Sequence, residues 1–100
     1  MKIIIIGLGL IGGSIAKSLS SSNNHEILAF DIDKSSITNA IDNKSISGAL
    51  NALDDLGNAE FKDSLVIIST PPNVSIDVLQ SLHFLFNSSV TITDLSLIHI

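Results

Sequence analysis

A glycine-rich turn lies close to the N-terminus and reads Gly7-Leu8-Gly9-Leu10-Ile11-Gly12. The spacing G-x-G-x-x-G binds the diphosphate of a dinucleotide when it joins a strand to a helix. Gly7 permits a tight turn, Gly9 lets the backbone approach the diphosphate, and Gly12 allows the helix to pack closely on the strand. The N–H groups and positive end of the helix would meet the negative charge without a cationic side chain.

An acidic residue follows this turn at the sequence spacing that is typical of dinucleotide-binding folds. Asp31 stands 19 residues after Gly12, where a carboxylate binds the adenine ribose hydroxyls of a dinucleotide. A carboxylate there repels a 2′-phosphate, and Asp33 adds to that repulsion, so the pattern favours NAD over NADP. The alternative is a turn that serves packing alone, with Asp31 an ordinary surface acid. The agreement of turn, spacing and context favours nucleotide binding.

A second loop, Ser69-Thr70-Pro71-Pro72, follows the apolar run 65–68. It falls at the carboxyl edge of the expected sheet, where ligands of such folds bind. Its backbone, at Ser69, Thr70 and Pro71, would pass beside the nicotinamide ribose, and the prolines would hold it rigid. The alternative is a strand end stopped by proline.

Other residues that could serve in catalysis or bind a metal are far apart in the sequence. His25, His83 and His99 have no carboxylate partner at motif spacing, and Asp54-Asp55 is typical of a solvated turn. With no cysteine and no cluster of acids or histidines, we expect neither a catalytic residue nor a metal site in this chain.

Composition limits the class of protein. The chain has 100 residues, of which 45% are hydrophobic, enough for one domain with a core. Five lysines, no arginine and ten acids give a net charge of −5, which argues against a nucleic-acid partner. Its apolar runs are too short to span a membrane, and the glycines make residues 3–16 a poor secretory leader. We expect a soluble, cytoplasmic protein.

The elements that must position these residues alternate between strands and helices. We expect strands at 2–6, 26–30, 65–68 and 90–93, and helices over 11–19, 34–43 and 74–86. Asp33 should cap the second helix and Asn73 the third. In the third, we expect the apolar residues to lie largely on one side: Ile76, Leu79, Leu82, Leu85 and Phe86. The order predicts an α/β fold, a Rossmann-like doubly wound, mostly parallel sheet that is incomplete at its C-terminal edge.

Residues 44–60 fit two interpretations. Ile46, Leu50, Leu53 and Leu56 have helical spacing, and Gly57 would end a helix there. The fold itself would place a short strand in the same segment, and both remain open.

The stretch from Gly7 to Ser14 closely resembles the opening of prephenate and arogenate dehydrogenases. Phe30-Asp31, Thr70-Pro71 and Thr93-Asp94 fall where that family ends its second, fourth and fifth strands. The resemblance implies an NAD(P)-dependent oxidative decarboxylation in tyrosine biosynthesis, a small-molecule substrate (prephenate or arogenate) and a homodimer. It also implies cofactor binding by the residues singled out above: Gly7, Leu8, Gly9, Leu10, Ile11, Gly12, Asp31, Ser69, Thr70 and Pro71.

The chain departs from that family after Asp94. Leu97 and His99 replace a serine and a lysine that family members carry, and their catalytic histidine and helical domain are missing. Residues 95–100 resemble the end of a sequencing adapter read as protein. We therefore expect residues 1–94 to be a truncated N-terminal NAD(P)-binding domain, inactive alone, and 95–100 a non-native tail.

Two other functions fit the same cofactor motif. One is the cofactor domain of another dehydrogenase, of the β-hydroxyacid dehydrogenase or pyrroline-carboxylate reductase type. The other is a stand-alone NAD-sensing module. Gly12-Gly13-Ser14 and Asp94 favour the prephenate or arogenate dehydrogenases.

Overall fold

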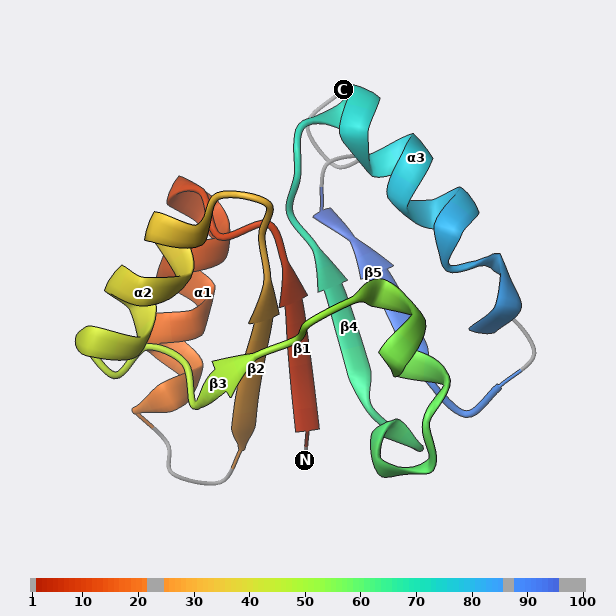
Figure 1. Ribbon diagram of the computed structural model, residues 1–100, viewed down its shortest axis with the longest axis horizontal. Helices are drawn as coiled ribbons and strands as arrows, with labels where there is room; N and C mark the ends of the chain where they lie inside the picture. Colours follow the sequence, from red (N-terminus) through yellow and green to blue (C-terminus); the bar gives the residue numbers. More distant parts are fainter. Residues whose placement is uncertain (1, 22–24, 86–87, 96–100) are drawn as a thin grey trace.

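The structure, a computed structural model, describes residues 2–21, 25–85 and 88–95 (Figure 1). Its strands are β1 (Lys2–Ile6), β2 (Glu26–Phe30), β3 (Gly48–Ala49), β4 (Leu65–Ile68) and β5 (Thr91–Asp94). Its α-helices are α1 (Leu10–Ser20), α2 (Lys34–Asp42) and α3 (Pro72–Ser81). Short 3-10 helices are η1 (Leu53–Gly57), η2 (Ala59–Phe61) and η3 (His83–Leu85). In the part of the chain that is described, no helix has both the length and the apolar character to cross a bilayer.

The strands form one parallel sheet in the order β3-β2-β1-β4-β5. The chain builds outward from β1 through β2 and β3, then crosses back to β4 and β5. Ile6 pairs with Phe30 of β2 and with Ile68 of β4, so three carboxyl ends meet at one edge. This topology confirms the predicted Rossmann-like fold, and its strand order reverses between β1 and β4, where such folds bind ligands.

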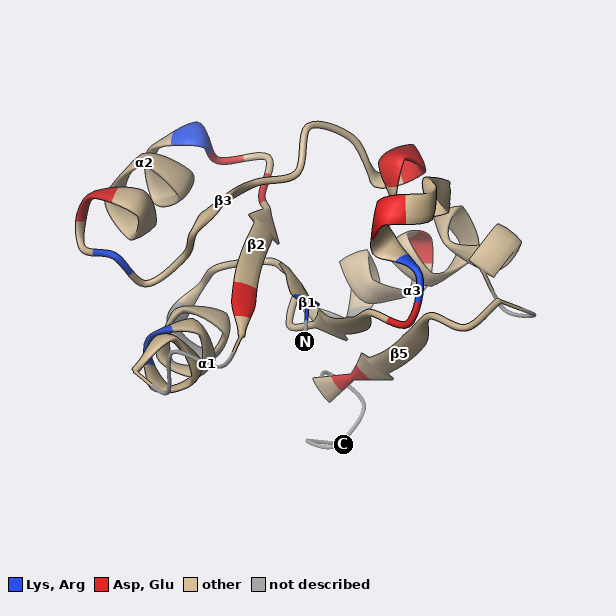
Figure 2. Cartoon of the chain, turned by 90° about the horizontal axis from the view of Figure 1, so that it is seen from below, with Lys and Arg blue, Asp and Glu red and all other residues tan. Residues whose placement is uncertain are grey.

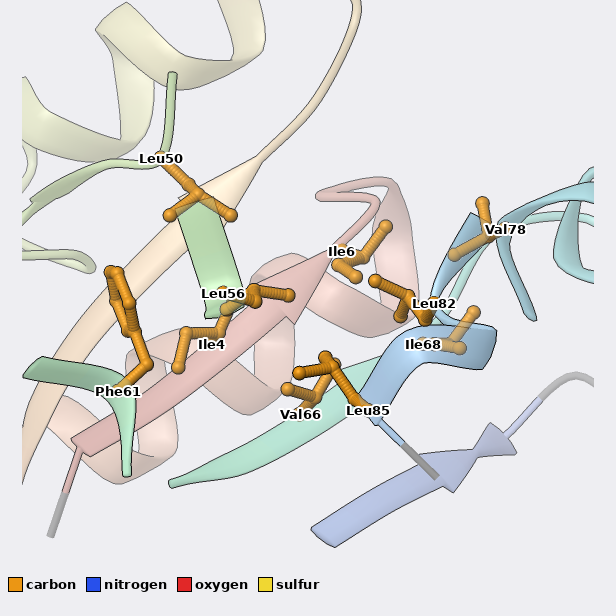
Figure 3. Close-up of a cluster of buried hydrophobic side chains, with 10 residues drawn as sticks. All are labelled: Ile4, Ile6, Leu50, Leu56, Phe61, Val66, Ile68, Val78, Leu82 and Leu85. Atoms are coloured by element: carbon orange, nitrogen blue, oxygen red, sulfur yellow. The ribbon is translucent and has the colours of Figure 1, made fainter. Parts of the chain in front are cut away.

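β1 lies in the middle of the sheet and is covered on both faces. Its isoleucines, residues 3–6, are at most 2% exposed. Because alternate side chains of a strand point to opposite faces, Ile3 and Ile5 pack with residues of α1 and α2. Ile4 and Ile6 pack with residues of α3 and the 3-10 helices, in the cluster that Figure 3 shows. Both layers of helices are therefore held by one strand.

α2 begins at Lys34 as predicted, because Asp33 caps its first turn. The Asp33 carboxylate accepts hydrogen bonds from the Ser35 hydroxyl at 2.6 Å and the Ser35 N–H at 3.0 Å. The Ser36 hydroxyl donates a third, at 3.2 Å. These bonds, those from Ser35 first, hold the pKa of Asp33 below its ordinary value, because they stabilise the charged form.

Residues 44–60 contain the short strand and no α-helix. β3 pairs with β2 through Gly48 and Ala49, and η1 follows. Ile46 packs in the α1–α2 layer, whereas Leu50 and Leu56 pack in the opposite layer. The segment therefore crosses the edge of the sheet, and the apolar residues with helical spacing do not share one face.

The third helix differs from its prediction at both ends. Pro71, not Asn73, is its N-cap, and the α-helix ends at Ser81 before η3 begins. Proline fits the first helical position because its fixed φ suits a helix and its missing N–H is not needed there. The buried side contains Ser75 and Leu82, while Ile76 is 55% exposed, so the expectation that Ile76 shares a side with Leu82 was wrong. Phe86 lies outside the described residues.

Candidate cofactor-binding site

A cavity of about 450 Å³ opens at the carboxyl ends of β1, β2 and β4. Six of the predicted cofactor residues line it: Gly7, Gly9, Asp31, Ser69, Thr70 and Pro71. Leu8 is buried and Gly12 is packed beneath the turn. Leu10 and Ile11 form the first turn of α1. The topology therefore brings the two predicted loops and the acidic residue to one place.

The first glycine of the turn is required by its backbone and by its neighbour. Gly7 has a φ of +92°, which side-chain-bearing residues rarely adopt. A Cβ atom at this position would lie 2.7 Å from Cγ2 of Thr70. The Gly7 N–H donates to the Phe30 carbonyl at 2.9 Å. The turn is thereby fixed between β2 and the loop after β4.

The other two glycines meet opposite surroundings. A Cβ at Gly12 would overlap the carbonyl oxygen of Gly7 and lie 2.5 Å from the Ser69 hydroxyl oxygen. A Cβ at Gly9 would have no atom within 4 Å, so the space above this residue is open. Close packing therefore requires Gly12, while Gly9 leaves room for a group to approach the backbone at the start of α1. These are the features that a bound diphosphate needs.

Asp31 makes two backbone contacts that the sequence did not reveal. Its Oδ2 accepts a hydrogen bond from the Leu8 N–H at 2.8 Å, and its Oδ1 accepts one from the Asp33 N–H at 2.9 Å. The carboxylate therefore lines the cavity and also holds the glycine turn. Asp31 and Asp33 both line the cavity, so this end of it carries negative charge. Figure 2 shows acidic residues in red along the segment between β2 and α2.

The hydroxyl groups of the second loop are engaged within the protein. The Ser69 hydroxyl donates to the Gly7 carbonyl at 2.5 Å. The Thr70 hydroxyl lies 2.7 Å from that of Ser75. Ser69 thus supports the glycine turn, and Thr70 forms the opposite wall of the cavity.

Apolar residues that sequence reasoning missed complete the lining. Ile32, Val74 and Val78 face the cavity, and Ile32 is 89% exposed. No sequence signal could have singled out Ile32, because isolated exposed apolar side chains are common on protein surfaces. These residues can enclose a flat apolar ring.

The remaining polar candidates lie elsewhere. His25 and His83 do not line the cavity, Asp54 and Asp55 belong to η1, and His99 is outside the described residues. Among the described residues, no group of three or more acidic, histidine or cysteine side chains is placed to hold a metal.

Known proteins share this arrangement. Residues 3–94 match the family described as the TrkA-N domain. Prephenate dehydrogenase from A. aeolicus, solved in complex with hydroxyphenyl propionate and NAD+, is 28% identical, with a TM-score of 0.79. That comparison covers 94% of this chain and 32% of the other.

Two further solved structures are similar. Synechocystis arogenate dehydrogenase is 26% identical, with a TM-score of 0.73 over 94% of this chain and 32% of that one. Another prephenate dehydrogenase structure from Aquifex aeolicus is 29% identical, with a TM-score of 0.77 over 92% of this chain and 33% of that one. The resemblance expected from residues 7–14 is confirmed, and this chain spans about a third of the length of these proteins.

Proposed function

We propose that this chain, which belongs to the TrkA-N domain family, is the NAD-binding part of a prephenate or arogenate dehydrogenase, the proteins it resembles in structure. The observation that carries this proposal is the cavity between the glycine turn and the loop after β4, which Gly9 lines with open space above it. The substrate and the complete reaction belong to the longer proteins that this chain resembles, of which it spans about a third.

Each part of the cavity suits one part of NAD. The backbone at Gly9 and the start of α1 would bind the diphosphate, because the helix presents N–H groups and a positive dipole end there. Asp31 would accept hydrogen bonds from the adenine ribose hydroxyls. Ile32, Val74 and Val78 would enclose the adenine ring, which leaves Ser69 to Pro71 on the nicotinamide side.

The charge of the cavity supports NAD rather than NADP. Asp31 and Asp33 both line it, and the lowered pKa of Asp33 keeps that carboxyl ionised at neutral pH. A 2′-phosphate on the adenine ribose would approach both carboxylates.

Bound NAD+ supplies an acceptor for the hydride that leaves the carbinol carbon of the cyclohexadienol ring, while loss of CO2 makes the ring aromatic. This chain's residues would bind and orient the cofactor for that step. We place this activity, by resemblance, in tyrosine biosynthesis, in a cytoplasmic homodimer. We also propose that residues 1–94 are the native domain and 95–100 a non-native tail, which resequencing the gene would test.

Titration of the chain with NADH and NADPH tests cofactor binding directly. NADH fluorescence can be followed without protein background, because the chain contains neither tryptophan nor tyrosine. We expect saturable binding of NADH and weaker binding of NADPH. Failure to bind either cofactor, with a folded chain by circular dichroism, would contradict the proposal, and tighter binding of NADPH would contradict the preference.

A further inference from the structure

Ser75 is a fully buried hydroxyl residue that does not line the cavity. Its hydroxyl donates to the carbonyl oxygen of Thr70 at 3.1 Å and lies 2.7 Å from the Thr70 hydroxyl oxygen. A serine hydroxyl has one hydrogen. When Ser75 donates it to the carbonyl, the Thr70 hydroxyl can donate to Ser75, so both contacts can be hydrogen bonds at once. Two hydrogen bonds therefore join α3 to Thr70.

The two prolines explain why a side chain, and not a backbone N–H group, donates a hydrogen bond to the Thr70 carbonyl. Pro71 and Pro72 have no N–H, so the turn that follows Thr70 lacks two backbone donors. The N–H groups of Val74 and Ser75 both bond to the carbonyl of Pro71. The Ser75 side chain therefore supplies the hydrogen bond that the Thr70 carbonyl needs, because buried carbonyls are costly to leave unpaired.

Thr70 is also held from the other side. Its Cγ2 and backbone nitrogen would lie 2.7 Å and 3.1 Å from a Cβ atom at Gly7, so it packs directly on the glycine turn. Thr70 is thus fixed between Ser75 and Gly7. Any movement of Thr70 would change the cavity wall opposite the turn.

We propose that Ser75 is a positioning residue for the nicotinamide side of the cofactor site. It sets the place of Thr70, and through it the loop from Ser69 to Pro71, without touching the cofactor. This inference rests on the proposed NAD binding. It predicts that loss of the Ser75 hydroxyl weakens binding of the nicotinamide half and leaves binding of the ADP half unchanged.

The experiment compares calorimetric titrations of the 100-residue chain with NAD+ and with ADP. Ser75→Ala should weaken NAD+ binding about three- to tenfold, the value of one or two hydrogen bonds. Its affinity for ADP should stay within about twofold. Ser81→Ala is the matched control, because the Ser81 hydroxyl bonds only to the Asp77 carbonyl on an exposed side of the same helix. It should change neither affinity.

Thr70→Val tests the hydrogen bond between the Thr70 and Ser75 hydroxyl groups from its other partner. It removes the hydroxyl pair but keeps a methyl group against Gly7 and leaves the Ser75 bond to the Thr70 carbonyl. We expect a smaller, NAD+-specific loss. Adding Thr70→Val to Ser75→Ala should cause no further loss, because Ser75→Ala already breaks that bond.

The outcomes separate this inference from the proposed function. Equal losses for NAD+ and ADP would show a purely structural role and overturn the inference, as would unchanged NAD+ affinity. If Ser75→Ala does not fold, the NAD+ to ADP ratio of Ser75→Cys decides, because a thiol fills the buried site but is a much weaker hydrogen-bond donor. No NAD+ binding by the unchanged chain would overturn the proposed function itself.

Discussion

The carboxylate of Asp31 accepts a hydrogen bond from the backbone N–H of Leu8 at 2.8 Å, and so joins the end of β2 to the glycine turn. Its other oxygen accepts the Asp33 N–H at 2.9 Å. The side chain that we expect to bind the adenine ribose is therefore also a structural link. We expect a substitution at this position to change both the geometry of the turn and the preference for NAD over NADP.

Asp31→Asn should lower stability and cofactor affinity together. The amide replaces one acceptor oxygen with a donor, so one of the two backbone N–H groups loses its partner at a cost of about 1–2 kcal/mol in the free energy of unfolding. We expect NAD+ affinity to fall about tenfold without a compensating gain for NADP+. Urea unfolding and calorimetry measure both effects. Asp42→Asn, at the exposed end of α2, removes the same charge and should alter neither; unchanged NAD+ affinity in Asp31→Asn would contradict the assigned role.

Gly12→Ala should lower the stability of the protein, whereas Gly9→Ala should leave it almost unchanged. A methyl group at Gly12 would overlap the Gly7 carbonyl, which we expect to cost about 1–3 kcal/mol of unfolding free energy. A methyl group at Gly9 meets open space, so stability should stay within about 0.5 kcal/mol. Gly9→Ala should nevertheless lose NAD+ affinity, because the methyl group occupies the approach to the diphosphate. Thermal unfolding without NAD+ measures the effect of each variant on stability, and unfolding with NAD+ measures its effect on cofactor binding. Normal NAD+ binding by Gly9→Ala would refute the placement of the diphosphate.

Ile32→Ser should weaken NAD+ binding and leave the free protein unchanged. The side chain is 89% exposed, so its removal should alter the unfolding free energy by less than about 0.5 kcal/mol. Apolar area covered by the adenine ring would be lost, and we expect a three- to tenfold weaker affinity, or about 1 kcal/mol. Ile76→Ser, another exposed isoleucine outside the cavity lining, is the control. Equal affinities for the two variants would remove Ile32 from the site.

The cap at Asp33 predicts a defined dependence of stability on pH. The pKa of Asp33 is lower in the folded protein, because the charged form accepts hydrogen bonds from Ser35 and Ser36. Its contribution is therefore complete above the unfolded pKa, about 3.9, and is lost as the pH falls through the lower folded value. The difference in melting temperature between the unchanged chain and Asp33→Asn should shrink across that interval. A difference that stays constant down to pH 2 would contradict this origin.

The predictable parts of the fold are those that local patterns specify. The isoleucine run of β1 and the apolar runs of β2 and β4 are each bounded by a turn, and their positions were predicted correctly. Asp33 was a correct cap because its serine partners are two and three residues away. β3 was not settled, because two residues carry too little pattern, and its pairing with β2 defines it.

The glycine motif of the candidate cofactor site could be predicted from the sequence, but the hydrogen bonds between its residues could not. Gly7 and Asp31 were singled out from motif spacing and Thr70 from its place after a strand, and all three line one cavity. The bond from Leu8 to Asp31 joins residues 23 apart, and no local pattern reveals it. Ser75 was missed because its polar side chain gave no sign of burial, yet it shares the buried side of α3 with Val78 and Leu82, whereas the apolar Ile76 is exposed.

β1 is the first strand in the chain and the central strand in the sheet, and this has a consequence for synthesis. The partners of Ile3 to Ile6 in β4 are synthesised some sixty residues after these isoleucines. Until then a very apolar strand lacks one neighbour, and long-range pairing of this kind is slow to form. The glycine turn also waits for Ser69 and Thr70. The nucleotide cleft is therefore begun when β1 and the glycine turn are made and is completed only after β4 and the loop that follows it have been made.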